Sequence, residues 1–246
     1  MKIVIFGAGL IGGSFSLALK KSGKISEVVG FGRSEKTLNE AKNLAIIDRV
    51  GTIGDLKDAD LILISSPVGQ MPAIMKKVYL HLEEDTLVTD AGSTKCDVVE
   101  MARSILGEKI RQFIPGHPIA GAEQSGPSAA RADLFEGRKV VLTPLPENPP
   151  GSVEQLRKTW EACGASVSEM SPEEHDHVFA AVSHLPHILS FVLVHGISKR
   201  ENRDLLLSFA ASGFRDFTRI AASSPRCGAT SAWPTGKPFS MNSTAT

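Results

Sequence analysis

The feature that most constrains the fold is a glycine-rich turn beginning at residue 7, directly after a short apolar strand pattern at residues 3–6. That β-branched run is typical of a buried parallel strand. A helical pattern follows at residues 14–21. The order strand, GxGxxG turn and helix predicts a dinucleotide-binding turn, although a purely structural glycine turn is the alternative. Gly7 permits the tight bend, Gly9 allows the backbone to approach a pyrophosphate, and Gly12 lets the helix pack closely.

Strand and helix patterns alternate from this turn to about residue 170. The expected further strands are residues 27–31, 61–64, 86–89, 113–114, 139–142 and 165–168, and the expected helices are 35–43, 70–80 and 153–162. Ser171 then caps a helical stretch that continues to about residue 194. The pattern predicts an α/β Rossmann-type dinucleotide-binding domain, residues 1–170, followed by an all-α domain, residues 171–246.

Polar residues follow two of the expected strands. Ser65, Ser66 and Pro67 come after residue 64, while Asp90 and Ser93 follow the strand that ends near residue 89. Because ligands of an open α/β sheet bind at the carboxyl ends of its strands, these residues are predicted to line the cofactor's path. Each serine taken alone fits turn or capping chemistry equally well.

The second strand ends without an acid that could bind an adenosine ribose. Arg33 and Ser34 stand there instead, and a guanidinium with a hydroxyl suits a 2′-phosphate. We therefore expect NADP in preference to NAD, with a solvated Arg33 as the alternative. Leu10 and Ile11 complete the expected cofactor-binding turn, where N–H groups at the helix start face the phosphates.

A histidine stands in a segment rich in proline and glycine. His117 lies between two prolines, with glycines on either side of the segment, so we expect a rigid irregular loop after the fifth strand. An imidazole exchanges protons near neutral pH, which makes His117 a candidate general base. A capping or packing histidine is the alternative.

Charged and aromatic residues later in the chain suggest a substrate pocket. His184 and His187 are three residues apart on one helical face, and Arg215 and Arg219 are one helical turn apart. Arginines beside histidines suit a carboxylate substrate, whereas surface arginines on a solvated face are the alternative. No HExxH spacing or cysteine cluster accompanies the histidines, so no metal site is expected.

The composition narrows the possible partners and the compartment. The 27 basic and 27 acidic side chains balance, which argues against a nucleic-acid partner or an anionic membrane surface. Three scattered cysteines and a start without a signal-peptide pattern lead us to expect a cytoplasmic protein. We find no apolar run long enough to cross a bilayer, and therefore expect no membrane partner.

Six motifs together resemble the prephenate/arogenate (cyclohexadienyl) dehydrogenase family of tyrosine biosynthesis. They are residues 7–12, 65–68, 89–93, 116–121, 183–187 and 216–219. The resemblance implies oxidative decarboxylation of prephenate to 4-hydroxyphenylpyruvate, or of arogenate to tyrosine, with hydride transfer to NAD(P)+. It also implies a helical substrate and dimerisation domain, and hence a homodimer if that domain is complete.

The resemblance assigns roles to individual residues. His117 would draw the proton from the ring hydroxyl, and Ser93 would orient that hydroxyl. The residues expected to bind the substrate are Arg219, His187, Ser183 and Glu123. Ala122 replaces a hydroxyl-bearing residue of some members, which leaves the choice between prephenate and arogenate open.

The last part of the chain departs from the family pattern. Residues 226–246 contain no acid, show no helical period and include Pro234 and Pro238. Restoring one guanine before residue 226 allows the shifted frame to read Glu-Met-Trp-Arg-Asp-Ile-Cys, which opens an amphipathic helix. We therefore hypothesise a frameshifted tail on a truncated helical domain.

Two other functions remain compatible with the sequence. A different dehydrogenase, acting on a 3-hydroxyacid, would share the glycine turn but would not need the segment around His117 together with residues 216–219. A non-catalytic or inactive truncated remnant would keep nucleotide binding alone. Turnover with prephenate or arogenate separates these alternatives.

Overall fold

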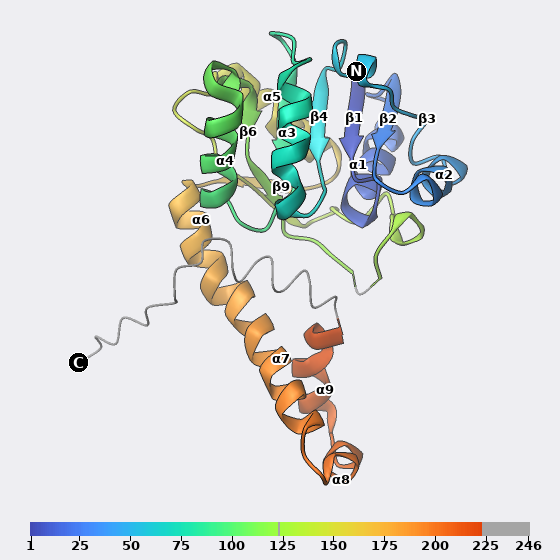
Figure 1. Ribbon diagram of the computed structural model, residues 1–246, viewed down its shortest axis with the longest axis vertical. Helices are drawn as coiled ribbons and strands as arrows, with labels where there is room; N and C mark the ends of the chain where they lie inside the picture. Colours follow the sequence, from blue (N-terminus) through green and yellow to red (C-terminus); the bar gives the residue numbers. More distant parts are fainter. Residues whose placement is uncertain (123, 223–246) are drawn as a thin grey trace, which may run out of the picture. The chain divides into compact units, whose positions relative to one another are not determined.

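The computed structural model describes residues 1–122 and 124–222 (Figure 1). It contains two compact units, Met1–Phe179 and a second that begins at Ala180. The expected substrate residue Glu123 and the unusual tail at residues 226–246 lie outside the described residues.

A six-stranded parallel sheet with the order β3-β2-β1-β4-β5-β6 forms the centre of the first unit. Its strands are β1 (Lys2–Phe6), β2 (Glu27–Phe31), β3 (Arg49–Val50), β4 (Leu61–Ile64), β5 (Leu87–Asp90) and β6 (Phe113–Ile114). The chain proceeds from β1 toward β3 on one side, and then returns to β4 on the other side. This reversal lies between β1 and β4, and doubly wound folds bind their ligands at the carboxyl ends of the strands at such a point.

Helices cover both faces of this sheet because its strands alternate between two apolar clusters. Ile3 and Ile5 of β1 pack into one cluster, and Val4 and Phe6 pack into the other. The first cluster takes side chains from α1 (Leu10–Lys21), α2 (Glu35–Asn43) and α5 (Pro150–Ala162). The second takes them from α3 (Met71–Tyr79) and α4 (Cys96–Leu106). Burial on both faces explains why consecutive residues are apolar at positions 3–6 of β1 and throughout β4.

A second sheet has three strands in the order β7-β8-β9, and it contains the segment of His117 that was expected to be a loop. It consists of β7 (Gly116–Pro118), β8 (Lys139–Leu142) and β9 (Ser166–Glu169). His117 was expected in an irregular loop, but it lies in β7 opposite Val141 of the antiparallel strand β8. Pro118 is tolerated because β7 is an edge strand, where a missing N–H removes no bond to an outer neighbour. The imidazole is therefore held on a strand.

Helix α6 (Pro172–Phe179) closes the first unit, and Ser171 caps it as predicted, because its Oγ accepts the N–H of Glu174 at 3.1 Å. The second unit opens with a π-helical turn (Ala180–His184) before α7 (Leu185–Ser198). Pro186 has no N–H for the carbonyl four residues earlier, which accounts for the irregular turn. The unit continues with α8 (Arg203–Ser208), α9 (Ser212–Thr218) and a 3-10 turn (Arg219–Ala222).

The sequence led us to expect no apolar run long enough to cross a bilayer, but one helix departs from that expectation. The helix that runs from Pro172 to Ser198 has 27 residues and, by length and composition, is long and apolar enough to cross a membrane. Polar residues interrupt the apolar run in the sequence, but few of them are charged. One such helix is weak evidence for a membrane span, because a helix that packs against protein passes the same test. Val192 is 63% exposed, so apolar surface of α7 is uncovered in this chain.

Candidate active site

The glycine turn adopts the geometry that its spacing predicts. Gly7 has a φ of +99° and donates its N–H to the carbonyl of Phe31 at 2.9 Å. A Cβ at Gly7 would lie 2.9 Å from the Ser65 carbonyl oxygen, and one at Gly12 would lie 2.4 Å from the Gly7 carbonyl oxygen. A Cβ at Gly9, by contrast, would meet no atom within 4 Å. The turn is therefore closely packed on its protein side and open at Gly9.

The start of α1 suits a phosphate group. The helix begins at Leu10 and Ile11, with Gly9 at its N-cap position and no acidic residue in its first turn. The N–H groups and the positive end of the helix dipole there attract anions. The open surface at Gly9 gives a pyrophosphate room to approach these groups. The residues of this turn therefore fit a dinucleotide.

The serines after β4 support the glycine turn from the neighbouring strand. Ser65 donates its hydroxyl to the Gly7 carbonyl at 2.7 Å, and Ser66 donates to the Phe6 carbonyl at 3.1 Å. Pro67 follows them and precedes a short 3-10 turn (Val68–Gln70). Ser65 and Ser66 thus connect the carboxyl ends of β1 and β4, where the strand order reverses.

The end of β2 presents no carboxylate between Gly30 and Ser34. Arg33 is exposed there. The Ser34 Oγ accepts the N–H of Thr37 at 3.3 Å and so caps α2. Arg33 is the cation that this strand end offers, whereas the oxygen of Ser34 already holds the helix start.

Asp90, which was expected on the cofactor's path, has a fully buried side chain, and both of its oxygens bind protein groups. It is fully buried, with Oδ2 2.5 Å from the Lys95 Nζ and 2.7 Å from the Gly92 nitrogen. Its Oδ1 accepts the N–H of Gly116 at 3.0 Å. Lys95, also fully buried, donates to the Gly116 carbonyl at 2.8 Å. The pair therefore fastens the start of β7 to the end of β5.

The register of the strands aligns these groups along one edge of the sheet. Phe6 pairs with Ile64, and Ile64 pairs with Asp90. Gly7 and Ser65 are the next residues beyond that row, and the residue bonded to Asp90 directly precedes His117. The structure thus places the glycine turn and His117 at the same carboxyl edge of the parallel sheet.

His117 is the first member of a chain of hydrogen-bonded side chains. Its Nδ1 lies 2.8 Å from the Nε2 of His175, and the Nδ1 of His175 lies 2.8 Å from the Asp176 Oδ1. The ring of Phe179 packs against both imidazoles, with centroids 5.0 Å from His117 and 4.6 Å from His175. His175 is fully buried and His117 is half-buried.

Asp176 is held at the start of α4. Its Oδ1 accepts the N–H of Lys95 at 2.8 Å, and its Oδ2 accepts the N–H of Cys96 at 2.9 Å. Burial alone would raise the pKa of Asp176. The hydrogen bonds from His175 and from the two backbone N–H groups outweigh it and lower the pKa to about 2. Asp176 is therefore a carboxylate at neutral pH.

Sequence reasoning did not assign site roles to His175, Asp176 or Lys95. In the sequence, 58 residues separate His175 from His117, so no local pattern connects the two. Lys95 could have been found from the sequence, because Asp90 follows a buried strand. An acid that is buried there needs a nearby cation, and Lys95 is five residues away.

The other expected site residues lie in different parts of the chain. Ser93 is half-buried in the loop between β5 and α4. In the second unit, Ser183 lies in the π-helical turn, and its carbonyl is 3.1 Å from the His187 Nδ1. Arg219 is exposed where α9 ends. Ser183 and His187 are thus neighbours within one turn of helix.

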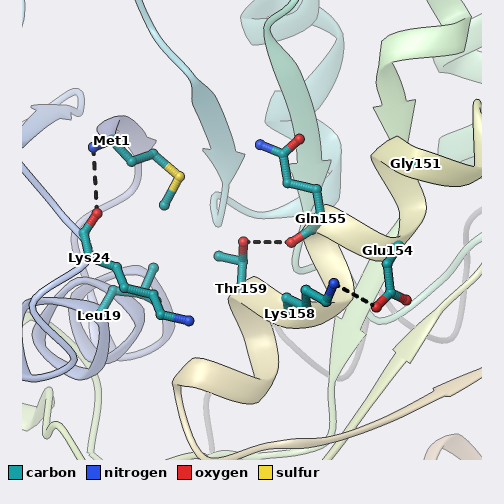
Figure 2. Close-up of a pocket in the computed structure, with 8 residues that line it drawn as sticks. All are labelled: Met1, Leu19, Lys24, Gly151, Glu154, Gln155, Lys158 and Thr159. Carbon is teal, nitrogen blue, oxygen red and sulfur yellow. Dashed lines mark hydrogen bonds and ion pairs between the residues drawn. The ribbon is translucent and has the colours of Figure 1, made fainter.

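A separate surface pocket of about 400 Å³ lies between α1 and α5 (Figure 2). Met1, Lys24 and Gln155 are among its lining residues. Met1 precedes β1, so the pocket opens at the amino end of that strand, away from the glycine turn at its carboxyl end. This pocket is not the dinucleotide site that the fold predicts.

Two family models match the chain. Residues 15–169 match "Prephenate dehydrogenase, nucleotide-binding domain", and residues 171–232 match "Prephenate dehydrogenase, dimerization domain".

Individual relatives and a solved structure are similar to this chain as well. The chain is 41% identical to prephenate dehydrogenase of Bacillus subtilis over 91% of its own length and 61% of that protein's. It is 36% identical to cyclohexadienyl dehydrogenase of Zymomonas mobilis, covering 91% of this chain and 77% of the relative. The structure of A. aeolicus prephenate dehydrogenase with hydroxyphenyl propionate and NAD+ matches with a TM-score of 0.86 and 38% identity, covering 94% and 81% of the two chains. The chain thus spans less than two thirds of the Bacillus subtilis protein.

Proposed function

The chain belongs to the prephenate dehydrogenase family, and we propose that it oxidatively decarboxylates prephenate or arogenate with hydride transfer to NAD(P)+. The products would be 4-hydroxyphenylpyruvate and tyrosine respectively. The observation that carries this proposal is that His117 and the glycine turn lie at one carboxyl edge of the sheet, joined through the aligned residues Phe6, Ile64 and Asp90.

His117 is the proposed general base. It takes the proton of the ring hydroxyl as the hydroxyl-bearing carbon gives up its hydride, and the bond to the ring carboxylate breaks to release carbon dioxide. A bound nicotinamide supplies the hydride acceptor. Ser93 orients the hydroxyl toward the imidazole. A base whose pKa lies near neutrality suits this proton transfer.

Gly7, Gly9, Leu10, Ile11 and Gly12 form the proposed dinucleotide cradle, with Ser65, Ser66 and Pro67 behind it. NADP is the proposed preferred cofactor. Arg33 supports this choice, since it is exposed at a strand end that lacks a carboxylate for a ribose hydroxyl. A guanidinium binds a phosphate with two parallel hydrogen bonds.

Arg219, His187, Ser183 and Glu123 are the proposed substrate residues. The substrate carries two carboxylates, so it needs fixed cations and hydrogen-bond donors. Arg219 supplies a permanent positive charge, and the His187 imidazole is held by the Ser183 carbonyl. Ala122 does not offer the hydroxyl found in some relatives, and both prephenate and arogenate are kept as substrates.

We also propose a division into a dinucleotide-binding domain at residues 1–170 and a helical domain at residues 171–246, with the helical domain forming a homodimer. Exposed apolar side chains of the second unit support this, since Val192 is 63% exposed and Phe209 is 80% exposed. Surfaces of this kind pack against protein partners.

A cytoplasmic location is also proposed. The free thiols of Cys96 and Cys163 fit a reducing cytoplasm.

Initial rates with two substrates and two cofactors test the proposal. Purified protein is mixed with prephenate or arogenate and with NADP+ or NAD+, and the reduced nicotinamide is followed by its absorbance. We expect reduction with at least one substrate, and faster reduction with NADP+. Nucleotide binding without reduction by either substrate would favour the binding-only remnant and overturn the proposed activity.

A further inference from the structure

We infer that His175 and Asp176 are positioning residues that fix the tautomer of His117, so that its Nδ1 carries the hydrogen and its Nε2 carries the lone pair. The two residues reach His117 through consecutive hydrogen bonds of 2.8 Å each. This inference rests on the proposed function for the role of His117 as a base, whereas the tautomer itself is a property of the folded chain.

The ionised carboxylate of Asp176 can take part in these hydrogen bonds only as an acceptor. Its carboxylate oxygens face three N–H groups, from Lys95, Cys96 and His175. An ionised carboxylate accepts hydrogen bonds and donates none. The Nδ1 of His175 must therefore carry a hydrogen and donate it to Asp176.

The direction of the next bond follows from the first. A neutral imidazole carries one hydrogen, so a His175 that donates from Nδ1 has a lone pair at Nε2. That nitrogen lies 2.8 Å from the Nδ1 of His117, which must then be the donor. The lone pair of His117 consequently resides on Nε2. A lone pair at that nitrogen is what a general base needs in order to accept a proton.

Packing holds the two rings in these positions. His175 is fully buried, and its backbone N–H is bonded to the Ser171 carbonyl at 2.9 Å within the first turn of α6. Phe179, one helical turn farther on, packs against both imidazoles. His117 is fixed from the other side because Gly116 is bonded to Asp90 and Lys95. A ring rotation would therefore break a hydrogen bond that burial makes costly to lose.

The described titratable side chains next to these hydrogen bonds are consistent with Asp176 as the acceptor, and they include the Cys96 thiol, which also hydrogen-bonds to Asp176. Lys95 and Asp90 are paired with each other. Burial raises the pKa of the Cys96 thiol to about 12, and the neighbouring carboxylates Asp176, Glu173 and Asp97 act in the same direction. The thiol therefore stays neutral near neutral pH. Asp176 is the charged group that acts on His175 by a direct hydrogen bond.

Nitrogen NMR of the folded protein reads the tautomers directly. Protein labelled with 15N-histidine is examined through long-range proton–nitrogen correlations near neutral pH, and His117→Asn and His175→Gln identify the signals by their loss. We expect both rings to carry the hydrogen on Nδ1. A hydrogen on Nε2 of His117, or on both nitrogens of His175, would overturn the inference. This measurement needs no turnover, so its outcome is independent of the proposed activity.

Asp176→Asn tests whether the tautomer matters for catalysis. A positioned base contributes roughly 10²–10⁴-fold to rate, so we expect kcat to fall about 100-fold with little change in KM. We also expect the acidic limb of the kcat/KM profile to move to lower pH, because His117 loses the support of a carboxylate. Glu174→Gln, an exposed change on the same helix, is the control and should leave both unchanged.

A merely structural role for Asp176 would reduce the amount of folded enzyme, but would leave the pH profile and the His117 tautomer of the folded fraction as in the wild type. That result would overturn the inference. If the wild-type protein shows no turnover with either substrate, the proposed activity fails, and the NMR experiment alone decides the tautomer.

Discussion

The Nζ of Lys95 lies 2.5 Å from the Oδ2 of Asp90, and both side chains are fully buried. The two groups also hold the N–H and the carbonyl of Gly116, which directly precedes His117. Desolvating two charges is costly, so such a pair persists only where further hydrogen bonds satisfy it. Here the pair positions the strand that carries the proposed base.

Lys95→Met should destabilise the protein strongly, because it leaves the Asp90 carboxylate buried without its cation. Breaking a buried pair in this way costs about 3–5 kcal/mol. Urea unfolding would measure the loss in free energy of unfolding. Lys21→Met is the matched control, since its partner Glu136 and Lys21 itself are both exposed, and surface pairs contribute about 1 kcal/mol or less. Equal small losses in both variants would contradict this account.

Gly9→Ala should weaken nucleotide binding while leaving the free energy of unfolding unchanged. The new methyl group meets no protein atom within 4 Å, but it occupies the space through which a pyrophosphate approaches. An added methyl group in a packed interface costs about 1–3 kcal/mol, or roughly 5- to 150-fold in affinity. Titration calorimetry with NADP+ measures the effect. Gly151→Ala, equally open but on α5, should bind as the wild type does; unchanged binding by Gly9→Ala would argue against the cradle.

Arg33→Gln should weaken NADP+ and spare NAD+, because only NADP+ has the phosphate that the guanidinium is proposed to hold. A hydrogen bond to a charged group contributes about 1.5–3 kcal/mol, so the dissociation constant for NADP+ should rise roughly 10-fold or more. Arg111→Gln, an exposed change just before β6, is the control. Equal losses for both cofactors would remove Arg33 as the source of the preference.

Asp176→Asn should flatten the acid dependence of stability. The folded pKa of Asp176 is about 2, below the ordinary value of 3.8. The ionised group therefore stabilises the fold above pH 3.8, and this contribution is lost as the pH falls from there through 2. The shift corresponds to about 2 kcal/mol. Urea unfolding of both proteins at pH 6, 4 and 3 should show a steeper decline for the wild type; parallel declines would show that the carboxylate is not linked to folding.

Much of the first unit could be predicted from local pattern. The observed bounds of β2 (Glu27–Phe31), β4 (Leu61–Ile64) and α2 (Glu35–Asn43) confirm the predicted ones, because apolar runs and a serine cap mark their ends. Helix α1 begins four residues earlier than predicted, at Leu10. Gly12 and Gly13 lie within it, since close packing against Ile5 and Ala130 outweighs the cost of glycine in a helix, about 1 kcal/mol each.

The features that sequence reasoning missed depend on distant partners. Strand β3 (Arg49–Val50) has two residues, too few for a periodic signal, and it exists through pairing with Val29 and Gly30. The second sheet and the contact between His117 and His175 arise only when separate segments fold together. For the same reason, the buried position of Asp90 could not be read from its place at a strand end.

The substitution His117→Asn tests the central claim most directly. Turnover of prephenate or arogenate is measured together with nucleotide affinity for the wild type and the variant. We predict that the variant loses turnover by roughly 10²–10⁴-fold and binds NADP+ as tightly as the wild type. Turnover at the wild-type rate would contradict the assignment of His117 as the base and, with it, the proposed mechanism.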